Sequence, residues 1–480
     1  MSVKAWSVRQ SVFAIGLSVM LGGPQVGLAQ PASILSGPQR GLPAAPIHEQ
    51  VPGLGEAQIG FLEALRASRG RAESQASERQ FRDAVRDAVK RHPEVQGAVA
   101  AQFGARGFTE EAKASLRPQV SGQTEGGWRS FDANRLFGVP ERRYNSAGWG
   151  LSFRQLLFDF GAAESAVRSA EARERIAAAR VEARRSELAL RAVQAAIEFE
   201  TARLQSALAR ENERARLAIA QYVRDRYELG GGSLSDVLRA QARVADAQAG
   251  SVAALTRVES AAAAYHEIFG VEPAEGSGPM RTVEVPDVGS TGQMAAGFAT
   301  VRAASAAREA AQSELKSVAA RALPQLNLEG TFTRRDQVGD GWPANDRAAL
   351  LNFRYEFYTG GAAQARESQA LARLDQADQD YASAVLSFER FASQVLAEAR
   401  SSEQLVRARV EAAELAASSL RAVREQFAFR RGTLLDLLNA QEVLQAAGRE
   451  LIDAYAQQVF GSYRVLYVAS RLDTKFGLTD

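Results

Sequence analysis

The stretch GTLLDLLNAQ, residues 432–441, has a near-copy in GSLSDVLRAQ, residues 232–241, two hundred residues earlier. A second pair of copies has the same offset: LSFRQLLFDFGAA, residues 151–163, matches LNFRYEFYTGGAA, residues 351–363. Because both pairs share one offset, the segment between them has the same length in each half. This conserved register indicates an internal duplication.

Short strands are predicted in each half. Apolar residues in LNFRYEF, residues 351–357, alternate with Asn352, Arg354 and Glu356, which indicates a strand with one apolar and one polar face. Proline opens both hairpins, at Pro118 and Pro324. We therefore predict strand hairpins at 118–157 and 324–357, with strands near the length of a tilted membrane-crossing strand. An ordinary antiparallel sheet with one solvated face is the alternative at this point.

A very long helix is predicted after each hairpin. From Ala162 to Tyr227 there is neither proline nor glycine, which allows a helix of roughly 100 Å. In the second half, large apolar residues recur every seven positions, as coiled-coil packing requires. They are Leu374, Tyr381, Phe388 and Val395.

The repeated stretches at 232–241 and 432–441 are predicted to belong to helix-hairpin tips, at 228–236 and 428–436. Glycine there supplies the left-handed conformation that ends a helix. Ser233 and Thr433 are predicted N-caps of the returning helices, with Asp236 and Asp436 three residues on, in the position of a capping-box acid.

The composition of the chain argues against several classes of function. Apolar residues make up 46% and charged residues 24% of the 480 residues, and the net charge of +2 gives no case for a nucleic-acid partner. The chain has no cysteine and only three, widely separated histidines, so neither a disulfide nor a metal site is expected. Phosphate-binding, zinc-protease and nucleophile-elbow motifs are missing from the sequence. We expect neither an enzyme nor a cofactor.

The chain divides into five segments. Residues 1–29 have the layout of a cleavable secretory signal, and residues 30–80, rich in proline at first, are expected to be a flexible leader. The first repeat is placed at 81–275, the second at 276–472 and a tail at 473–480. After the signal, no apolar run approaches the ~18 residues that a transmembrane helix requires.

Four strands cannot close a barrel, and an open sheet edge is not viable in lipid. If the strands lie in a membrane, several chains must therefore associate. The helical hairpins would then extend the wall of a tube into an aqueous compartment.

The sequence resembles the TolC family of outer-membrane efflux and secretion channels across residues 81–472. The matching motifs, in order, are RHPEV, RPQV, QLLFDFG, DVLRAQ, LPQL, FYTGG and DLLNAQ. The resemblance implies a mostly α membrane protein of α+β class. It also implies a homotrimer in which a twelve-stranded β-barrel in outer-membrane lipid continues into a periplasmic α-helical barrel.

The resemblance also implies partners, namely a periplasmic adaptor that engages the tips and an inner-membrane transporter. An ABC transporter would serve type I protein secretion, which the tip sequences favour. A proton-driven pump would serve multidrug efflux, the alternative. A soluble periplasmic coiled-coil scaffold is a more distant alternative.

The resemblance also implies roles for specific residues. The expected gate or constriction consists of Asp236, Asp436, Asn439, Arg430 and Arg431. The expected tip residues that contact the adaptor are Gly230, Gly231, Gly232, Ser233, Leu234, Gly432, Thr433 and Leu434. The expected strand–helix junctions are Pro118, Gly161, Pro324 and Gly361.

Overall fold

The computed structural model describes residues 55–70, 75–131, 142–274, 276, 278–279, 281–284, 290–338 and 343–478. The predicted signal at 1–29 lies outside these residues. Their elements follow in the order α1 (Glu56–Gly70), α2 (Gln75–Arg91), α3 (Pro93–Ala114), β1 (Gln119–Phe131), β2 (Arg142–Phe158), α4 (Ala162–Glu228), α5 (Leu234–Phe269), α6 (Thr291–Gly297), α7 (Ala299–Arg321), β3 (Gln325–Val338), β4 (Pro343–Arg354), α8 (Ala362–Ala428), α9 (Leu434–Val468) and α10 (Leu472–Phe476).

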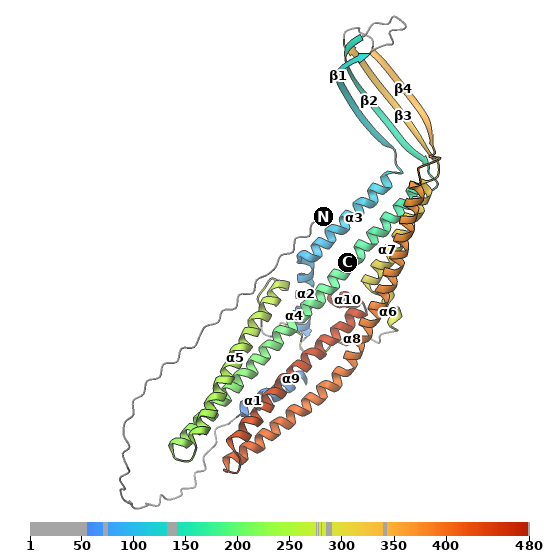
Figure 1. Cartoon of the computed structure of the whole chain (residues 1–480). Helices are drawn as coiled ribbons and strands as arrows, with labels where there is room; N and C mark the ends of the chain where they lie inside the picture. Colours follow the sequence, from blue (N-terminus) through green and yellow to red (C-terminus); the bar gives the residue numbers. More distant parts are fainter. Residues whose placement is uncertain are drawn as a thin grey trace, which may run out of the picture. The chain divides into compact units, whose positions relative to one another are not determined.

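The duplication is visible in the two long helices. α4 and α8 each have 67 residues, and their first and last residues differ by the same two hundred positions. Each begins after a left-handed glycine, Gly161 with φ 81° or Gly361 with φ 87°. α4 returns as α5 and α8 returns as α9, which gives two helical hairpins (Figure 1).

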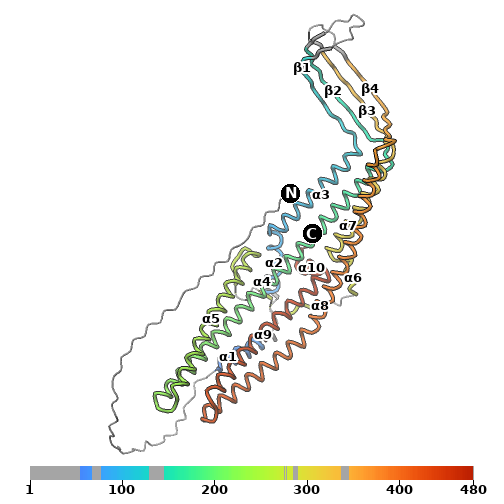
Figure 2. The backbone as a smooth tube through the Cα atoms, in the orientation of Figure 1, coloured from blue at the N-terminus to red at the C-terminus, as the bar shows by residue number. Residues whose placement is uncertain are grey.

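The four strands form one antiparallel sheet in the order β1-β2-β3-β4. Its register pairs Leu151 with Phe332 and Gln325 with Arg354. β4 therefore ends at Arg354, earlier than the predicted limit of 357. Pro324, which precedes β3, has no N–H to extend the ladder. Figures 1 and 2 show the strands following α3 and α7 and leading into α4 and α8.

The helices pack around α4, which contacts α3, α5, α7 and α9. Alanine allows this close approach: Ala189, Ala192 and Ala196 on α4 are fully buried. The part of the two hairpins farther from the sheet contains the largest apolar cluster among the described residues. This cluster includes Leu208, Leu420 and Leu444. None of the described helices combines the length and apolarity that crossing a membrane would require.

Two terminal segments are more regular than the sequence indicates. The expected flexible leader at 30–80 contains α1 and the start of α2, and the expected tail contains most of α10. Isolated helices this short are marginal in water and gain their stability from packing, so local pattern gives little sign of them. Phe476 of α10, for example, is 1% exposed and stacks on Tyr463.

Candidate functional site: two hairpin tips and a two-faced sheet

The first tip joins α4 to α5 through three glycines. Gly230 adopts the left-handed conformation, with φ 76°. The Ser233 hydroxyl accepts a hydrogen bond from the Asp236 backbone N–H at 3.1 Å and donates to the Asp236 carboxylate at 2.9 Å. Asp236 also lies 3.7 Å from the Arg239 guanidinium. The predicted N-cap at Ser233 is confirmed.

The second tip has a complete capping box. The Thr433 hydroxyl accepts from the Asp436 N–H at 3.2 Å, and the Asp436 carboxylate accepts from the Thr433 hydroxyl at 2.6 Å and from its backbone N–H at 3.2 Å. These bonds favour the ionised acid, so they lower the pKa of Asp436, the hydroxyl bond contributing most. The predicted capping box is therefore confirmed here.

The residue that turns the second tip is different from the one predicted. Arg430, not Gly432, has the left-handed conformation there, with φ 62°. Gly432 is needed for space instead, because a Cβ at this position would lie 3.2 Å from the Phe427 backbone nitrogen. A left-handed arginine is uncommon, and Arg430 lies inside the C-terminal turn of α8 that the Arg431 N–H closes by donating to the Gln426 carbonyl at 2.8 Å.

Four of the five predicted gate residues are exposed, but one predicted contact residue is buried. Arg430, Arg431, Asp436 and Asn439 are exposed, and Asp236 is half-buried. Within the described part of one chain, neither arginine side chain forms an ion pair. Leu234 is 54% exposed, whereas Leu434 is only 6% exposed. Leu434 belongs to the apolar cluster between the hairpins, so it is unsuited to contact a partner.

Polar ties connect the two hairpins behind the tips. Arg216 on α4, 3% exposed, donates to the Leu438 carbonyl at 3.3 Å and to the Glu442 carboxylate at 3.2 Å, both on α9. Burial lowers the pKa of the Arg216 guanidinium, and the Glu442 charge opposes that shift. Sequence reasoning missed this tie because its partners are more than two hundred positions apart and share no motif.

A second tie joins the same two helices. Gln205 donates to Asp453 at 2.6 Å. Burial raises the pKa of Asp453, an effect that the Gln205 hydrogen bond and nearby arginines oppose. Polar bonds therefore accompany apolar packing over several turns of the α4–α9 contact.

One face of the sheet is apolar in the half that lies nearer to the helices. Trp149 and Phe332 lie on it with ring centroids 5.1 Å apart. The strand register places further apolar residues on the same face, where several side chains are largely exposed. They are Val120, Leu151, Phe153, Leu328, Leu351 and Phe353.

The opposite face is polar and cross-linked. Arg154 lies 3.3 Å from Glu329, and Arg335 lies 3.2 Å from Glu125 two strands away. The Ser121 and Ser152 hydroxyls share a hydrogen bond of 2.7 Å. The predicted two-faced alternation is therefore present in both hairpins.

The strand–helix junctions are built from left-handed residues and short caps. In the first repeat, Asp159 accepts from the backbone N–H groups of Gly161 and Ala163 at 3.1 and 2.6 Å. In the second, the Thr359 hydroxyl accepts from the Ala363 N–H at 3.1 Å. At Gly161 and Gly361 nothing would touch an added Cβ, so glycine is favoured there by conformation rather than by space.

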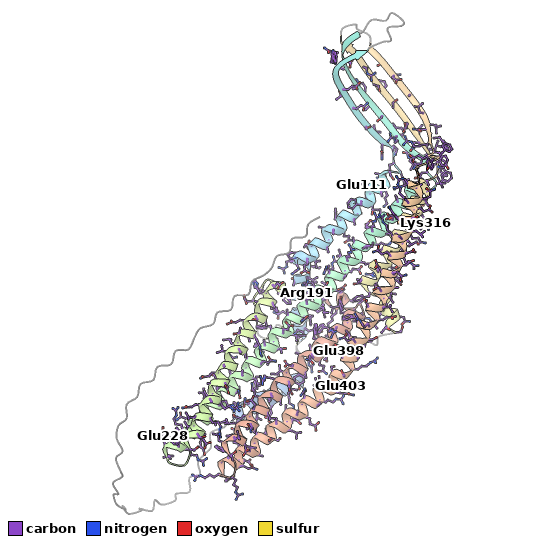
Figure 3. The ribbon with its side chains drawn as sticks, viewed as in Figure 1. Glu111, Arg191, Glu228, Lys316, Glu398 and Glu403 are labelled. Carbon is purple, nitrogen blue, oxygen red and sulfur yellow. The ribbon has the colours of Figure 1, made fainter. Side chains whose placement is uncertain are left out.

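Charged residues along the helices are mostly paired and solvated. Arg191 on α4 pairs with Glu94, and Glu398 on α8 pairs with Arg464. Figure 3 labels Arg191 and Glu398 among the side chains drawn along the helices. Among the described residues, no group of three or more histidines and carboxylates is arranged to hold a metal ion. These charges are therefore typical of solvated helix surfaces.

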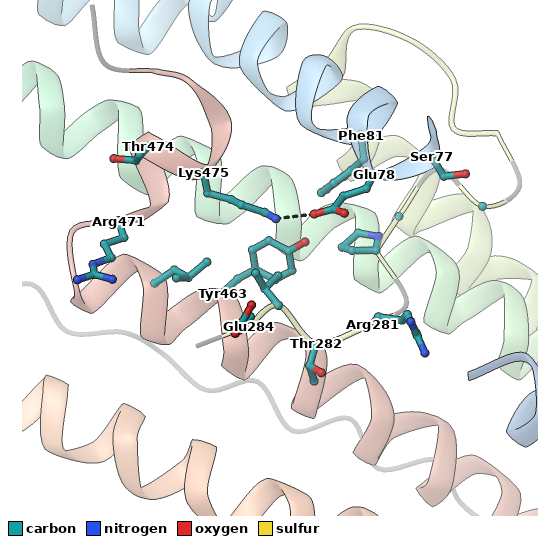
Figure 4. Close-up of a pocket in the computed structure, with 15 residues that line it drawn as sticks. Ser77, Glu78, Phe81, Arg281, Thr282, Glu284, Tyr463, Arg471, Thr474 and Lys475 are labelled. Atoms are coloured by element: carbon teal, nitrogen blue, oxygen red, sulfur yellow. Dashed lines mark hydrogen bonds and ion pairs between the residues drawn. The ribbon is translucent and has the colours of Figure 1, made fainter. Parts of the chain in front are cut away.

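A cavity of about 900 Å³ lies between α2, α9, α10 and the described part of the segment before α6, residues 276, 278–279 and 281–284 (Figure 4). Lys475 donates to Glu78 across it at 2.5 Å, and this bond lowers the pKa of Glu78. Phe81 and Tyr463 form part of its lining. The cavity thus lies where α2 meets the C-terminal helices α9 and α10.

Comparisons with known proteins agree with this geometry. The profile described as "Outer membrane efflux protein" matches residues 84–271 and 293–461. The chain is 28% identical over 377 residues to the outer membrane efflux protein BepC of Brucella suis, covering 75% of this chain and 78% of that protein. It is 25% identical over 405 residues to the alkaline protease secretion protein AprF of Pseudomonas aeruginosa, covering 80% and 83%.

A solved structure shows the same fold. The Campylobacter jejuni outer membrane channel CmeC superimposes with a TM-score of 0.74 at 14% identity, over 82% of this chain and 86% of that chain.

Two long helical hairpins joined to a two-faced sheet define a subunit of an outer-membrane channel. The chain belongs to the outer membrane efflux protein family, and the TolC-family resemblance of its sequence is confirmed. It is a channel protein of the outer membrane rather than an enzyme. The soluble periplasmic scaffold is thereby excluded.

Proposed function

We propose that three copies of this chain form one passive conduit through the outer membrane. The observation that carries this proposal is the four-stranded sheet, which is apolar on one face, polar on the other and open at the β1 and β4 edges. An open edge in lipid leaves backbone groups without partners. Three chains with 4 strands each would close a barrel of twelve, its apolar face toward lipid and its polar face toward the lumen.

The helical hairpins would continue this tube into the periplasm. α4 and α8, at 67 residues each, span roughly 100 Å. The junction residues Pro118, Gly161, Pro324 and Gly361 would set the change from strand to helix. The two repeats of each chain would give the helical barrel its pseudo-sixfold arrangement.

The cargo we propose is a secreted polypeptide, delivered by type I secretion. Support comes from the relative AprF, named as an alkaline protease secretion protein, and from the tip sequences. An inner-membrane ABC transporter would supply the energy, and a periplasmic adaptor would connect it to the tips. Multidrug efflux with a proton-driven pump is the second candidate, because BepC is named as an efflux protein.

We assign the periplasmic mouth to the two tips. Asp236 and Asp436, with Asn439, Arg430 and Arg431, would surround the constriction, and the exposed arginines would tie neighbouring chains in the closed state. The adaptor would contact the exposed tip residues from Gly230 to Leu234, together with Gly432 and Thr433.

Deleting the gene and measuring two outputs tests the choice of cargo. Type I secretion predicts that a specific protein disappears from the culture medium while drug susceptibility stays unchanged. Raised susceptibility with an unchanged set of secreted proteins would favour efflux. If neither output changes in the deletion strain, both assignments are contradicted.

A further inference from the structure

Helix α1 packs against both helical hairpins although it lies before the family-matched region, which begins at residue 84. Its apolar stripe consists of Ile59, Leu62 and Leu65, which are 5%, 4% and 6% exposed. These residues join a buried cluster to which α4, α5, α8 and α9 contribute. The first hairpin contributes α4 to this seat and the second contributes α8 and α9.

The seat is shaped for this helix. Gly448 on α9 leaves room where Leu62 of α1 meets Leu208 of α4: a Cβ on Gly448 would lie 3.2 Å from Leu62 and 2.8 Å from Leu208. Gly55, which precedes α1, has φ 87° and lies against Leu420 of α8. The two glycines therefore permit a close fit to all three helices.

A buried amide bridges the hairpins through α1. Gln58, with 0% exposure, donates to Asn212 on α4 at 3.2 Å and to Gln445 on α9 at 3.1 Å. The two acceptors belong to different hairpins, so this one side chain forms a hydrogen bond with each hairpin. Helix α1 thus adds polar as well as apolar contacts across the α4–α9 boundary.

Ion pairs fix the orientation of α1 along α8. Glu56 pairs with Arg424, Glu63 with Arg421 at 2.6 Å, and Arg66 with Glu414. Such exposed pairs contribute little stability individually. Together they define how α1 is aligned along α8. Because Arg424 lies within about two helical turns of the second tip, α1 is attached close to the proposed mouth.

We propose that α1 is a built-in clasp that holds the two hairpins of each chain together near their tips and is displaced when the tips separate. This role rests on the proposed channel function. On this proposal α1 can leave the wall of the tube, because part of its seat is polar and unsatisfied. Among the described residues, the side-chain carbonyl of Gln58 and the side-chain amide of Gln441 have no hydrogen-bond partner in the seat. Release of α1 would allow water to reach them.

The test compares full-length channels in planar lipid bilayers, with deuterium uptake of residues 56–70 measured in parallel. Leu62→Asp places a charge in the apolar seat, so we expect uptake by α1 to rise about tenfold or more and single-channel conductance to increase severalfold. Wild-type conductance in Leu62→Asp channels with a released α1 would overturn the clasp. Rapid uptake by α1 in the wild type, or unchanged uptake in Leu62→Asp, would overturn it as well.

A charge exchange provides a second test if Leu62→Asp fails to assemble. Glu63→Arg should raise the conductance, and adding Arg421→Glu should restore the wild-type value. The matched control exchanges Arg409 and Glu450, an exposed pair within the second hairpin, and should change nothing. Equal conductance of the wild type, Glu63→Arg, the double variant and the control would contradict the clasp and leave the proposed channel function intact. If none of the four conducts, the channel function and the clasp are both contradicted.

Discussion

Arg216 on α4 and Glu442 on α9 form an ion pair of 3.2 Å that connects the two helical hairpins of one chain. The Arg216 side chain is 2% exposed and that of Glu442 56% exposed, so the arginine end is buried and the carboxylate end is solvated. Removing the acid would leave a buried guanidinium with fewer partners, which is costly.

We predict that Glu442→Ala weakens the α4–α9 contact. The expected loss is about 1–2 kcal/mol in the free energy of local opening, since the Leu438 carbonyl still accepts from Arg216. Hydrogen exchange of residues 208–216 measures it. The matched control is Glu450→Ala, which removes an exposed acid from the same helix and should have a much smaller effect. Equal exchange in both variants would contradict the prediction.

Thr433→Ala should loosen the second tip. The substitution removes the N-cap of α9 and costs about 1 kcal/mol of local stability. Ser233→Ala at the first tip should cost less, because the described structure shows the full reciprocal box at Thr433 and Asp436. Exchange rates of the first turns of α9 and α5 compare the two tips. A larger effect at Ser233 would refute the ranking.

The same capping box predicts a pH dependence. Because its hydrogen bonds lower the pKa of Asp436 below the usual 3.8, the ionised acid stabilises the tip above that value. The stabilisation is lost as the pH falls through the lower folded-state pKa. Hydrogen exchange at the second tip, corrected for intrinsic rates, should accelerate below about pH 4. Asp436→Asn should abolish this acceleration, and its persistence would assign it to another group.

The strand register predicts opposite outcomes for neighbouring residues. Leu351 lies on the apolar face and Asn352 on the polar face. Arginine on a lipid-facing strand position costs about 2–4 kcal/mol at mid-membrane, so Leu351→Arg should reduce the amount of heat-modifiable protein in the outer membrane. Asn352→Arg should assemble normally. The reverse result would mean that the apolar face does not contact lipid.

Charge at the tips should influence ion selectivity. Acidic rings in a narrow pore favour cations, so the pair Asp236→Asn and Asp436→Asn should lower the cation preference in single-channel recordings. Asparagine keeps a side-chain oxygen that can accept the hydrogen bonds of Ser233 and Thr433, which limits structural side effects. Asp375→Asn, on an exposed part of α8 far from the tips, is the control. Unchanged selectivity would exclude both acids from the constriction.

Local sequence signals were sufficient for the long helices, the tips and the two faces of the sheet. Proline-free and glycine-free runs, capping residues and a two-residue alternation act over short distances, so they are readable without a structure. Features that depend on distant contacts were not predicted. The burial of Leu434, the Arg216–Glu442 tie and the docked helix α1 all depend on packing between segments far apart in the chain. The left-handed Arg430 lies in a local turn at the end of α8, where the sequence pattern predicted that glycine would turn the chain.

If the two-faced sheet closes only when three chains associate in the outer membrane, the protein extracted from purified outer membranes should be a trimer. Native mass spectrometry should then show a single complex with the mass of three chains. Recovery mainly as a single chain, or in the soluble periplasmic fraction, would show that closure does not need three chains in the membrane.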